Sequence, residues 1–103
     1  MASGRFGAVD VPATTETTIY TAPSGKIASA TISLCNRTGS TVSVRVAIAA
    51  AATATVAEWI EYEAPIAPNG VLERTGLVLN AGERLNVYAS AAGVSAVAFG
   101  FEE

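Results

Sequence analysis

The sequence predicts an all-β fold, an antiparallel β-sandwich of jelly-roll or immunoglobulin-like type with about seven to eight short strands. Three observations predict it. Polar and apolar residues alternate along most of the chain, turn residues recur about every 8 to 12 residues, and the connections are too short for the helical crossovers that parallel strands need. The length of 103 residues suits one domain, which we expect to span residues 14–103.

The N-terminal stretch, residues 1–13, lacks a sustained period and contains small residues and glycines. We therefore expect a flexible N-terminal arm that is disordered alone and becomes ordered on neighbouring subunits. Its apolar side chains Phe6, Val9 and Val11 are then candidate partner-binding residues. On this interpretation, deletion of residues 1–9 would leave the melting temperature of the isolated domain almost unchanged.

The first strands are predicted from composition and alternation. Residues 14–20 are rich in Thr, which favours a strand with one face in water. Residues 26–36 and 41–48 each alternate between apolar and polar side chains, and turn residues occupy positions 36–40 between them. We therefore predict that these two strands form a hairpin.

The later strands follow a region of mixed signals. Residues 49–57 combine Ala, which favours helix, with Thr and Val, which do not, so we expect a loop with about one helical turn. Further strands are predicted at residues 58–64, 71–80, 84–90 and 94–101, and Gly76 should introduce a bulge or bend into the second of them. The residues predicted to lie in the core are Ile32, Leu34, Val44, Val46, Ile60, Tyr62, Leu85, Val87 and Phe99.

Composition indicates a surface that is covered mainly by small, neutral side chains. Hydrophobic residues make up 50% of the chain and charged residues only 15%. Such a surface suits contact with other proteins, although it also fits a neutral monomer. The net charge of −3 argues against binding to nucleic acids or anionic membranes, because both need a positive surface. The basic residues are scattered along the chain: Arg5, Lys26, Arg37, Arg45, Arg74 and Arg84.

No targeting segment is recognisable in the sequence. The N-terminal residues lack the unbroken apolar core of a secretory signal, and the longest apolar run, residues 46–52, is far short of the roughly 18 residues that span a bilayer. We therefore expect the protein to be made in a cytoplasm. The single cysteine, Cys35, cannot form an internal disulfide and is typical of a small buried hydrophobic residue.

The chain contains no histidine, which removes the usual general base, the Ser-His and Cys-His pairs and the commonest zinc ligand. A glycosidase needs only two carboxylates, but Glu61 and Glu63 are expected on one solvated strand face. The other candidate carboxylates are Glu58, Glu73 and Glu83. With a single aspartate and no Gly-rich phosphate loop, the sequence predicts a non-enzyme with no cofactor and no metal site.

Two aromatic residues fall on the polar faces of their predicted strands. Trp59 alternates in phase with Glu61 and opposite to Ile60. Tyr88 lies on the phase opposite to Leu85. An aromatic side chain on a polar face is a candidate contact for a partner chain or a sugar ring. The alternative for Trp59 is burial under the neighbouring Ala-rich loop.

Two runs of residues resemble a recurrent pattern in small virion proteins of tailed bacteriophages. Residues 19–26 read IYTAPSGK and lead into a strand that ends in the triplet NRT. Residues 76–85 read GLVLNAGERL and are followed by VYAS at residues 87–90. The resemblance covers residues 14–101 and implies a structural β-sandwich in the particle, either a head decoration (cement) protein or a tail, baseplate or fibre component. The matching residues carry no chemistry, so no functional residue is transferred.

The resemblance and the composition together favour a head decoration protein that binds the major capsid protein or other virion proteins and stabilises the capsid shell. The expected location is then the virion, after assembly in the host cytoplasm. A small domain gains burial from a partner subunit, so we expect a homo-oligomer, with a trimer favoured. The alternatives are a tail, baseplate or fibre component, and a carbohydrate-binding module that contacts host glycans through Trp59 and Tyr88.

Overall fold

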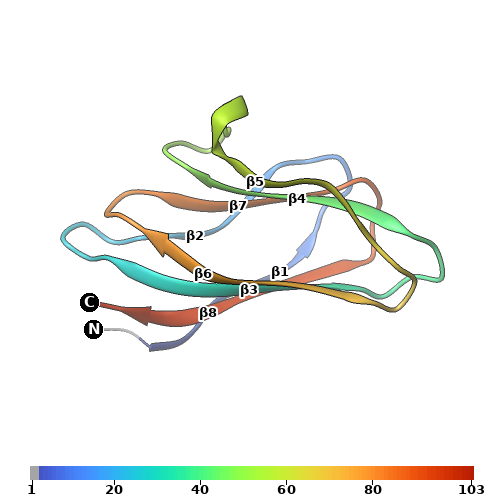
Figure 1. Cartoon of the computed structure of the whole chain (residues 1–103), viewed down its shortest axis with the longest axis horizontal. Coiled ribbons are helices and arrows are strands. Elements are labelled where there is room, and N and C mark those ends of the chain that lie inside the picture. Colours follow the sequence, from blue (N-terminus) through green and yellow to red (C-terminus); the bar gives the residue numbers. More distant parts are fainter. Residues whose placement is uncertain (1–2) are drawn as a thin grey trace.

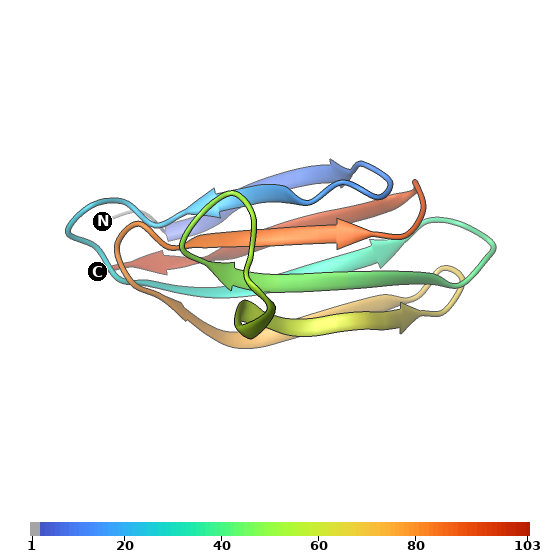
Figure 2. The ribbon, with the colours of Figure 1, turned by 90° about the horizontal axis from the view of Figure 1, so that it is seen from above.

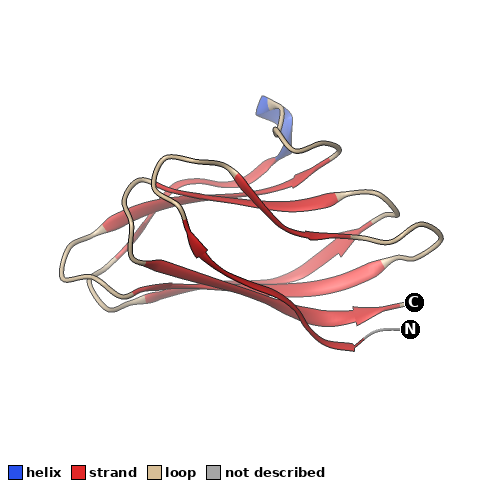
Figure 3. Ribbon diagram, turned by 180° about the vertical axis from the view of Figure 1, so that it is seen from behind, coloured by secondary structure: helices blue, strands red, loops and turns tan. Residues whose placement is uncertain are grey.

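Two β-sheets stacked face to face make up the computed structural model, which describes residues 3–103 (Figure 1). The strands within these residues are β1 (Ser3–Val11), β2 (Thr17–Thr21), β3 (Ala28–Asn36), β4 (Val42–Ala49), β5 (Trp59–Ile66), β6 (Val71–Leu79), β7 (Arg84–Ala89) and β8 (Val94–Glu102). A single turn of 3₁₀ helix, η1 (Val56–Glu58), lies between β4 and β5 (Figure 3). It overlaps the end of the loop at residues 49–57, in which the sequence predicts about one helical turn, and extends one residue into the predicted strand.

The order of the strands identifies the fold as a jelly roll. The first sheet has the order β1-β8-β3-β6 and the second sheet β2-β7-β4-β5, and neighbouring strands are antiparallel. Within residues 3–103, β4 and β5 are the only consecutive strands that share a sheet. Figure 2 shows the second sheet from above, lying over the first. The predicted antiparallel sandwich is confirmed, and the order is that of the jelly roll rather than of the immunoglobulin-like alternative.

The predicted alternation of side chains accounts for most of the core between the sheets. Six of the predicted core residues are completely buried: Ile32, Leu34, Val44, Val46, Leu85 and Val87. Ile60 is half-buried and packs against the same cluster. Burial of each large aliphatic side chain contributes about 1.5–3 kcal/mol. The two sheets are therefore held together mainly by the strand faces that the alternation identifies.

Tyr62, another predicted core residue, lies on the surface with 59% of its area exposed. The cause is a β-bulge in β5. Glu63 has a positive φ of 52°, and the register of β5 against β4 shifts between Val44 and Val46. A bulge adds one residue to a strand and reverses the phase of the side chains beyond it. The simple alternation that predicts an inward Tyr62 is therefore wrong.

The last strand, β8, also has the phase opposite to the predicted one. Ala96 and Ala98 are completely buried, whereas Phe99 is 39% exposed and Phe101 is exposed beside it. A prediction from the sequence places the larger side chains, Phe99 and Phe101, in the core, and this choice of face is wrong. In the folded chain, Leu and Val side chains from other strands fill most of the interior, and β8 contributes Val94 and the two alanines to it.

The hairpin predicted over residues 26–48 is wrong, because β3 and β4 belong to different sheets. The segment between them crosses from one sheet to the other. Asn36 braces this crossing: its buried side-chain amide donates to the carbonyl oxygens of Ser40 and Ile66. Its side-chain oxygen accepts a hydrogen bond from the backbone N–H of Thr38. Turn residues indicate where the chain changes direction, but not which sheet receives the next strand.

The prediction of a flexible arm at residues 1–13 is wrong for the part that the structure describes, because residues 3–11 form β1 and pair with β8. Gly7 permits this edge of the sandwich to close. A Cβ atom at Gly7 would lie 2.5 Å from the carbonyl oxygen of Ile19 in β2, so a larger residue would push the two strands apart. Residues 1–2 of the predicted arm lie outside the described residues.

The bulge predicted at Gly76 is confirmed. Gly76 has a φ of 73°, and the register of β6 against β3 shifts between Ala30 and Ile32. Glycine adopts this left-handed conformation without the strain that a side chain would cause. The bulge leaves a position without a side chain on the outer face of the first sheet.

Candidate functional site

The three predicted partner-binding residues of the supposed arm are built into the sandwich. Val11 is a core residue and Val9 packs against the core. Phe6 stacks on Tyr20 of β2, with ring centroids 4.2 Å apart and ring planes at 10°. These side chains join the edge of the first sheet to that of the second, so they offer little surface to a partner.

Tyr20 also connects this edge with the C-terminal strand. Its hydroxyl donates a hydrogen bond of 2.5 Å to the Glu102 carboxylate, which is only 8% exposed. Burial, this hydrogen bond and the negative charge of Glu102 all disfavour the phenolate, so the pKa of Tyr20 is raised well above its ordinary value. The pair acts as a structural clamp between β2 and β8.

The other two predicted residues, Trp59 and Tyr88, meet around Arg45 on the outer face of the second sheet. The guanidinium carbon of Arg45 lies 4.3 Å from the ring centroid of Tyr88 and 4.4 Å from that of Tyr62. Its distance from the Trp59 ring centroid is 5.9 Å. Trp59 and Tyr62 also meet edge to face, with centroids 5.8 Å apart. Arg45, Trp59, Tyr62 and Tyr88 are termed the aromatic cluster below.

The bulge in β5 creates this cluster. It turns Tyr62 outward and brings the Glu63 carboxylate to the Nε atom of Arg45, which donates a hydrogen bond of 2.5 Å. This hydrogen bond raises the pKa of Arg45. Cation–π contacts with the tyrosine rings hold the same guanidinium group. The result is an ordered surface that combines aromatic rings, one cation and one carboxylate.

A groove of about 330 Å³ adjoins the aromatic cluster and is lined by Val56, Trp59 and Tyr62. Val56 lies on η1 and is 94% exposed. Such an exposed apolar residue beside aromatic rings is typical of a contact surface. Because Glu63 and Arg45 belong to the same sheet face, the groove suits a ligand with an apolar face and a polar edge.

Buried polar groups hold the loop that carries η1. Asn86 is completely buried, and its side-chain amide donates to the carbonyl oxygens of residues 51 and 52. The Glu16 carboxylate accepts hydrogen bonds from the Asn86 amide and from the backbone N–H of Ala54. Alternation places Asn86 on the solvent side of β7, and the loop covers it there. The position of Val56 thus depends on polar contacts rather than on the core.

The two carboxylates considered for glycoside hydrolysis do not share a face, contrary to the prediction. Glu63 pairs with Arg45 on the outer face of the second sheet. Glu61 pairs with Arg74 of β6 at 2.5 Å and closes the edge between the two sheets. The bulge at Glu63 separates the two carboxylates, so each has its own cation as a partner.

The remaining candidate carboxylates are found at separate places. The Glu58 carboxylate accepts hydrogen bonds from the backbone N–H groups of Thr55 and Ala50, which lower its pKa. Glu83 accepts a backbone hydrogen bond in the turn before β7. Glu73 lies on the outer face of the first sheet. Within residues 3–103, no group of three or more His, Cys, Asp and Glu side chains is placed to hold a metal ion.

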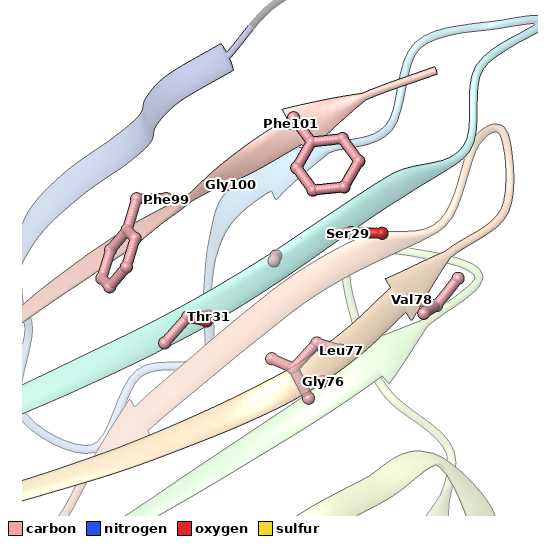
Figure 4. Close-up of a pocket in the computed structure, with 9 residues that line it drawn as sticks. Ser29, Thr31, Gly76, Leu77, Val78, Phe99, Gly100 and Phe101 are labelled. Atoms are coloured by element: carbon pink, nitrogen blue, oxygen red, sulfur yellow. The ribbon is translucent and has the colours of Figure 1, made fainter.

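The outer face of the first sheet carries a second exposed surface, termed the apolar face. Its large exposed side chains are Val71, Val78, Phe99 and Phe101. A groove of about 210 Å³ lies between β8 and β6, over the small residues of β3 (Figure 4). Cys35 lies half-buried on the same face instead of in the core, opposite Val71 in the β3–β6 ladder. Exposed apolar area of this kind is typical of contact surfaces.

Sequence reasoning missed Tyr62 and the two phenylalanines of β8 as surface residues. It placed Arg45 on the outer strand face but missed its contacts with the aromatic rings. The sequence contains no signal for the bulge at Glu63, because glutamate rarely takes a positive φ and its presence does not suggest one. A signal for β8 was present: Val94, Ala96 and Ala98 form an apolar phase as regular as the aromatic one. Size alone favours the wrong choice between the two.

The part of the chain that the structure describes contains no helix that is long and apolar enough to cross a bilayer. Comparisons with protein-family models, curated proteins and solved structures found no match to this chain. Function is therefore inferred from the two exposed surfaces of the molecule.

Proposed function

We propose that the protein is a head decoration (cement) protein of a tailed bacteriophage, which binds the capsid shell through the aromatic cluster. The composition of the cluster carries this proposal. Tryptophan, tyrosine and arginine are the residues that most often dominate the free energy of binding at protein interfaces. Here one Trp, two Tyr and one Arg are gathered on a single sheet face. The resemblance of the sequence to small virion proteins of tailed bacteriophages supports the same function.

The aromatic cluster is ordered before any partner arrives. Arg45 is held by the rings of Tyr62 and Tyr88 and by Glu63, so little side-chain freedom is lost when a partner covers it. Figure 1 shows η1 projecting above the second sheet. Val56 of η1 lines one groove with Trp59 and Tyr62 of the cluster. A partner would therefore touch the loop through Val56 and the sheet through Tyr62, and both side chains are exposed.

Imaging of the labelled protein on phage particles tests the proposed location. We expect the label to be distributed over the head shell. A label found only below the portal would contradict the decoration function and would favour the alternative of a tail, baseplate or fibre component, in which the same surface would bind a different virion protein.

Carbohydrate binding is a second candidate function, and the groove beside Trp59 favours it. Sugar rings stack on aromatic side chains through their apolar faces and form hydrogen bonds through their hydroxyl groups. The groove offers the rings of Trp59 and Tyr62, with the polar pair Arg45 and Glu63 on the same sheet face.

A fluorescence titration with host surface polysaccharide tests this second function, because the chain contains a single tryptophan. Saturable binding that is lost in Tyr62→Ser and retained in Val78→Ser, on the opposite sheet, would support a carbohydrate-binding module. No change in fluorescence across the titration would reject it and leave the protein-binding function.

A further inference from the structure

The apolar face of the first sheet has the shape of a ridge beside a trough. Phe99 and Phe101 project from β8 and form the ridge, while Ser29 and Thr31 of the neighbouring β3 form a floor of small side chains (Figure 4). Val78 of β6 lies opposite Ser29 in the ladder and bounds the far side of the trough. The trough is the groove of about 210 Å³ described above.

The strand order makes this shape self-complementary. β8 and β3 are the central strands of the first sheet, and β1 and β6 are its edges. A twofold axis parallel to the strands, between β8 and β3, places the ridge of one copy over the trough of the other and the reverse. We propose that the apolar face binds a second copy of this chain in this face-to-face arrangement.

The charges on the edge strands fit the same arrangement. Arg5 lies on β1 and Glu73 on β6, both on the outer face, and β8 and β3 separate them within one chain. Within residues 3–103, neither side chain takes part in an ion pair, whereas Asp10 on the same face already pairs with Arg37. The twofold axis brings β1 over β6 of the second copy. Arg5 lies level with Thr31 of β3, and Glu73 lies level with Ser33, two residues further along that strand. Arg5 of each copy therefore faces Glu73 of the other diagonally, within the reach of these two long side chains, which gives two equivalent ion pairs.

The proposed pairing differs from the trimer that the sequence favours, because a surface that is self-complementary about a twofold axis is closed by two copies. It leaves the aromatic cluster, on the opposite sheet, free in both copies. The pairing does not depend on the proposed capsid function, since it is a property of the purified chain.

Analytical ultracentrifugation of the purified chain tests the pairing. We expect the wild type to show a monomer–dimer equilibrium. Phe99→Ser removes one of the two side chains of the ridge and should raise the dimer dissociation constant by about tenfold or more. The matched variant Tyr62→Ser changes an exposed aromatic residue of the other sheet and should leave that constant unchanged. A wild type that is monomeric at all concentrations, or that forms trimers, would overturn the proposal.

A charge swap tests the arrangement without altering the ridge. Arg5→Glu and Glu73→Arg each place like charges together in the homodimer, so each should weaken dimerisation by about tenfold. Both residues are exposed, so the fold should be retained, as a thermal melt would verify. When the two variants are mixed, every contact joins opposite charges and heterodimers should form with nearly wild-type affinity. Absence of heterodimers in the mixture would show that the proposed twofold arrangement is wrong.

Discussion

The two outer faces of the sandwich expose large side chains for different structural reasons. On the first sheet, Phe99 points outward because Ala98 and other small residues of β8 occupy the interior positions. On the second sheet, Tyr62 points outward because of a bulge, and it then contacts Arg45. The first face is apolar with charges at its edges, whereas the second concentrates rings and charges at one place. We propose that the first face binds a second copy of this chain and that the second face binds the phage particle.

The largest difference in the free energy of unfolding is expected between substitutions at two neighbouring residues, one in the core and one on the apolar face. Leu77 is 4% exposed and Val78 is 56% exposed. Leu77→Asp buries an unpaired charge and should lower the free energy of unfolding by about 4 kcal/mol or more. In the monomer, Val78→Asp places the same charge in water and should change this free energy by less than about 1 kcal/mol, at protein concentrations too low for dimerisation. Urea denaturation measures both values. Similar losses in the two variants would show that the outer face has been assigned to the wrong phase.

Deletion of residues 1–9 should have the next largest effect, in contrast to the sequence-based expectation of an unchanged melting temperature. The deletion removes most of β1, including the ring stack of Phe6 on Tyr20 and the contact of Val9 with the core. Loss of these two side chains should lower the free energy of unfolding by about 3 kcal/mol or more. A melting temperature equal to that of the intact chain would contradict the assignment of β1 to the first sheet.

A smaller loss of stability is expected on the second sheet, where polar contacts hold the loop that carries η1. Asn86→Ala removes the donor that holds residues 51 and 52 and leaves Glu16 without one of its partners. We expect a loss of about 1–3 kcal/mol in the free energy of unfolding, together with a change in Trp59 fluorescence. Asn80→Ala, in the exposed turn before β7, serves as the control. An Asn86→Ala protein with unchanged stability and fluorescence would show that the loop is held by other contacts.

The smallest effect is expected on the stability of the protein at alkaline pH, and it should differ between variants of Tyr20 and Tyr62. The raised pKa of Tyr20 means that the folded protein keeps a proton that the unfolded chain loses above about pH 10. The contribution of Tyr20 to the free energy of unfolding should therefore be fully present below about pH 10 and should fall as the pH rises further. Tyr20→Phe should reduce this fall, whereas Tyr62→Phe, at an exposed position, should not. Melting temperatures measured across this pH range test the expectation, and equal slopes in both variants would contradict it.

The fold was predictable from the sequence where the alternation of side chains is uninterrupted. β3, β4 and β7 show this clearly, since Leu34, Val44 and Leu85 are buried as expected. β1 was missed because glycines and a bulge beside Phe6 interrupt its period. The supposed hairpin of β3 and β4 failed for a different reason, because the choice of sheet depends on long-range pairing that local turn residues do not encode.

The candidate site was predictable only in part. Trp59 and Tyr88 were found because they are aromatic residues on polar strand faces. Tyr62 and Arg45 were not identified as site residues. The bulge at Glu63 brings the Tyr62 ring to Arg45, and a glutamate in the left-handed conformation has no reliable sequence signal. The aromatic cluster therefore becomes visible only when three strands are brought together in the second sheet.

Retention on capsids tests whether the aromatic cluster is the surface through which, as we propose, the protein binds the phage particle. Purified protein would be incubated with capsids that lack it, and the bound fraction would be measured after sedimentation. Tyr62→Ser should weaken binding by about tenfold or more, whereas Ser24→Ala, in the exposed turn after β2, should bind like the wild type. Equal binding of Tyr62→Ser and the wild type, with both proteins folded, would contradict the claim.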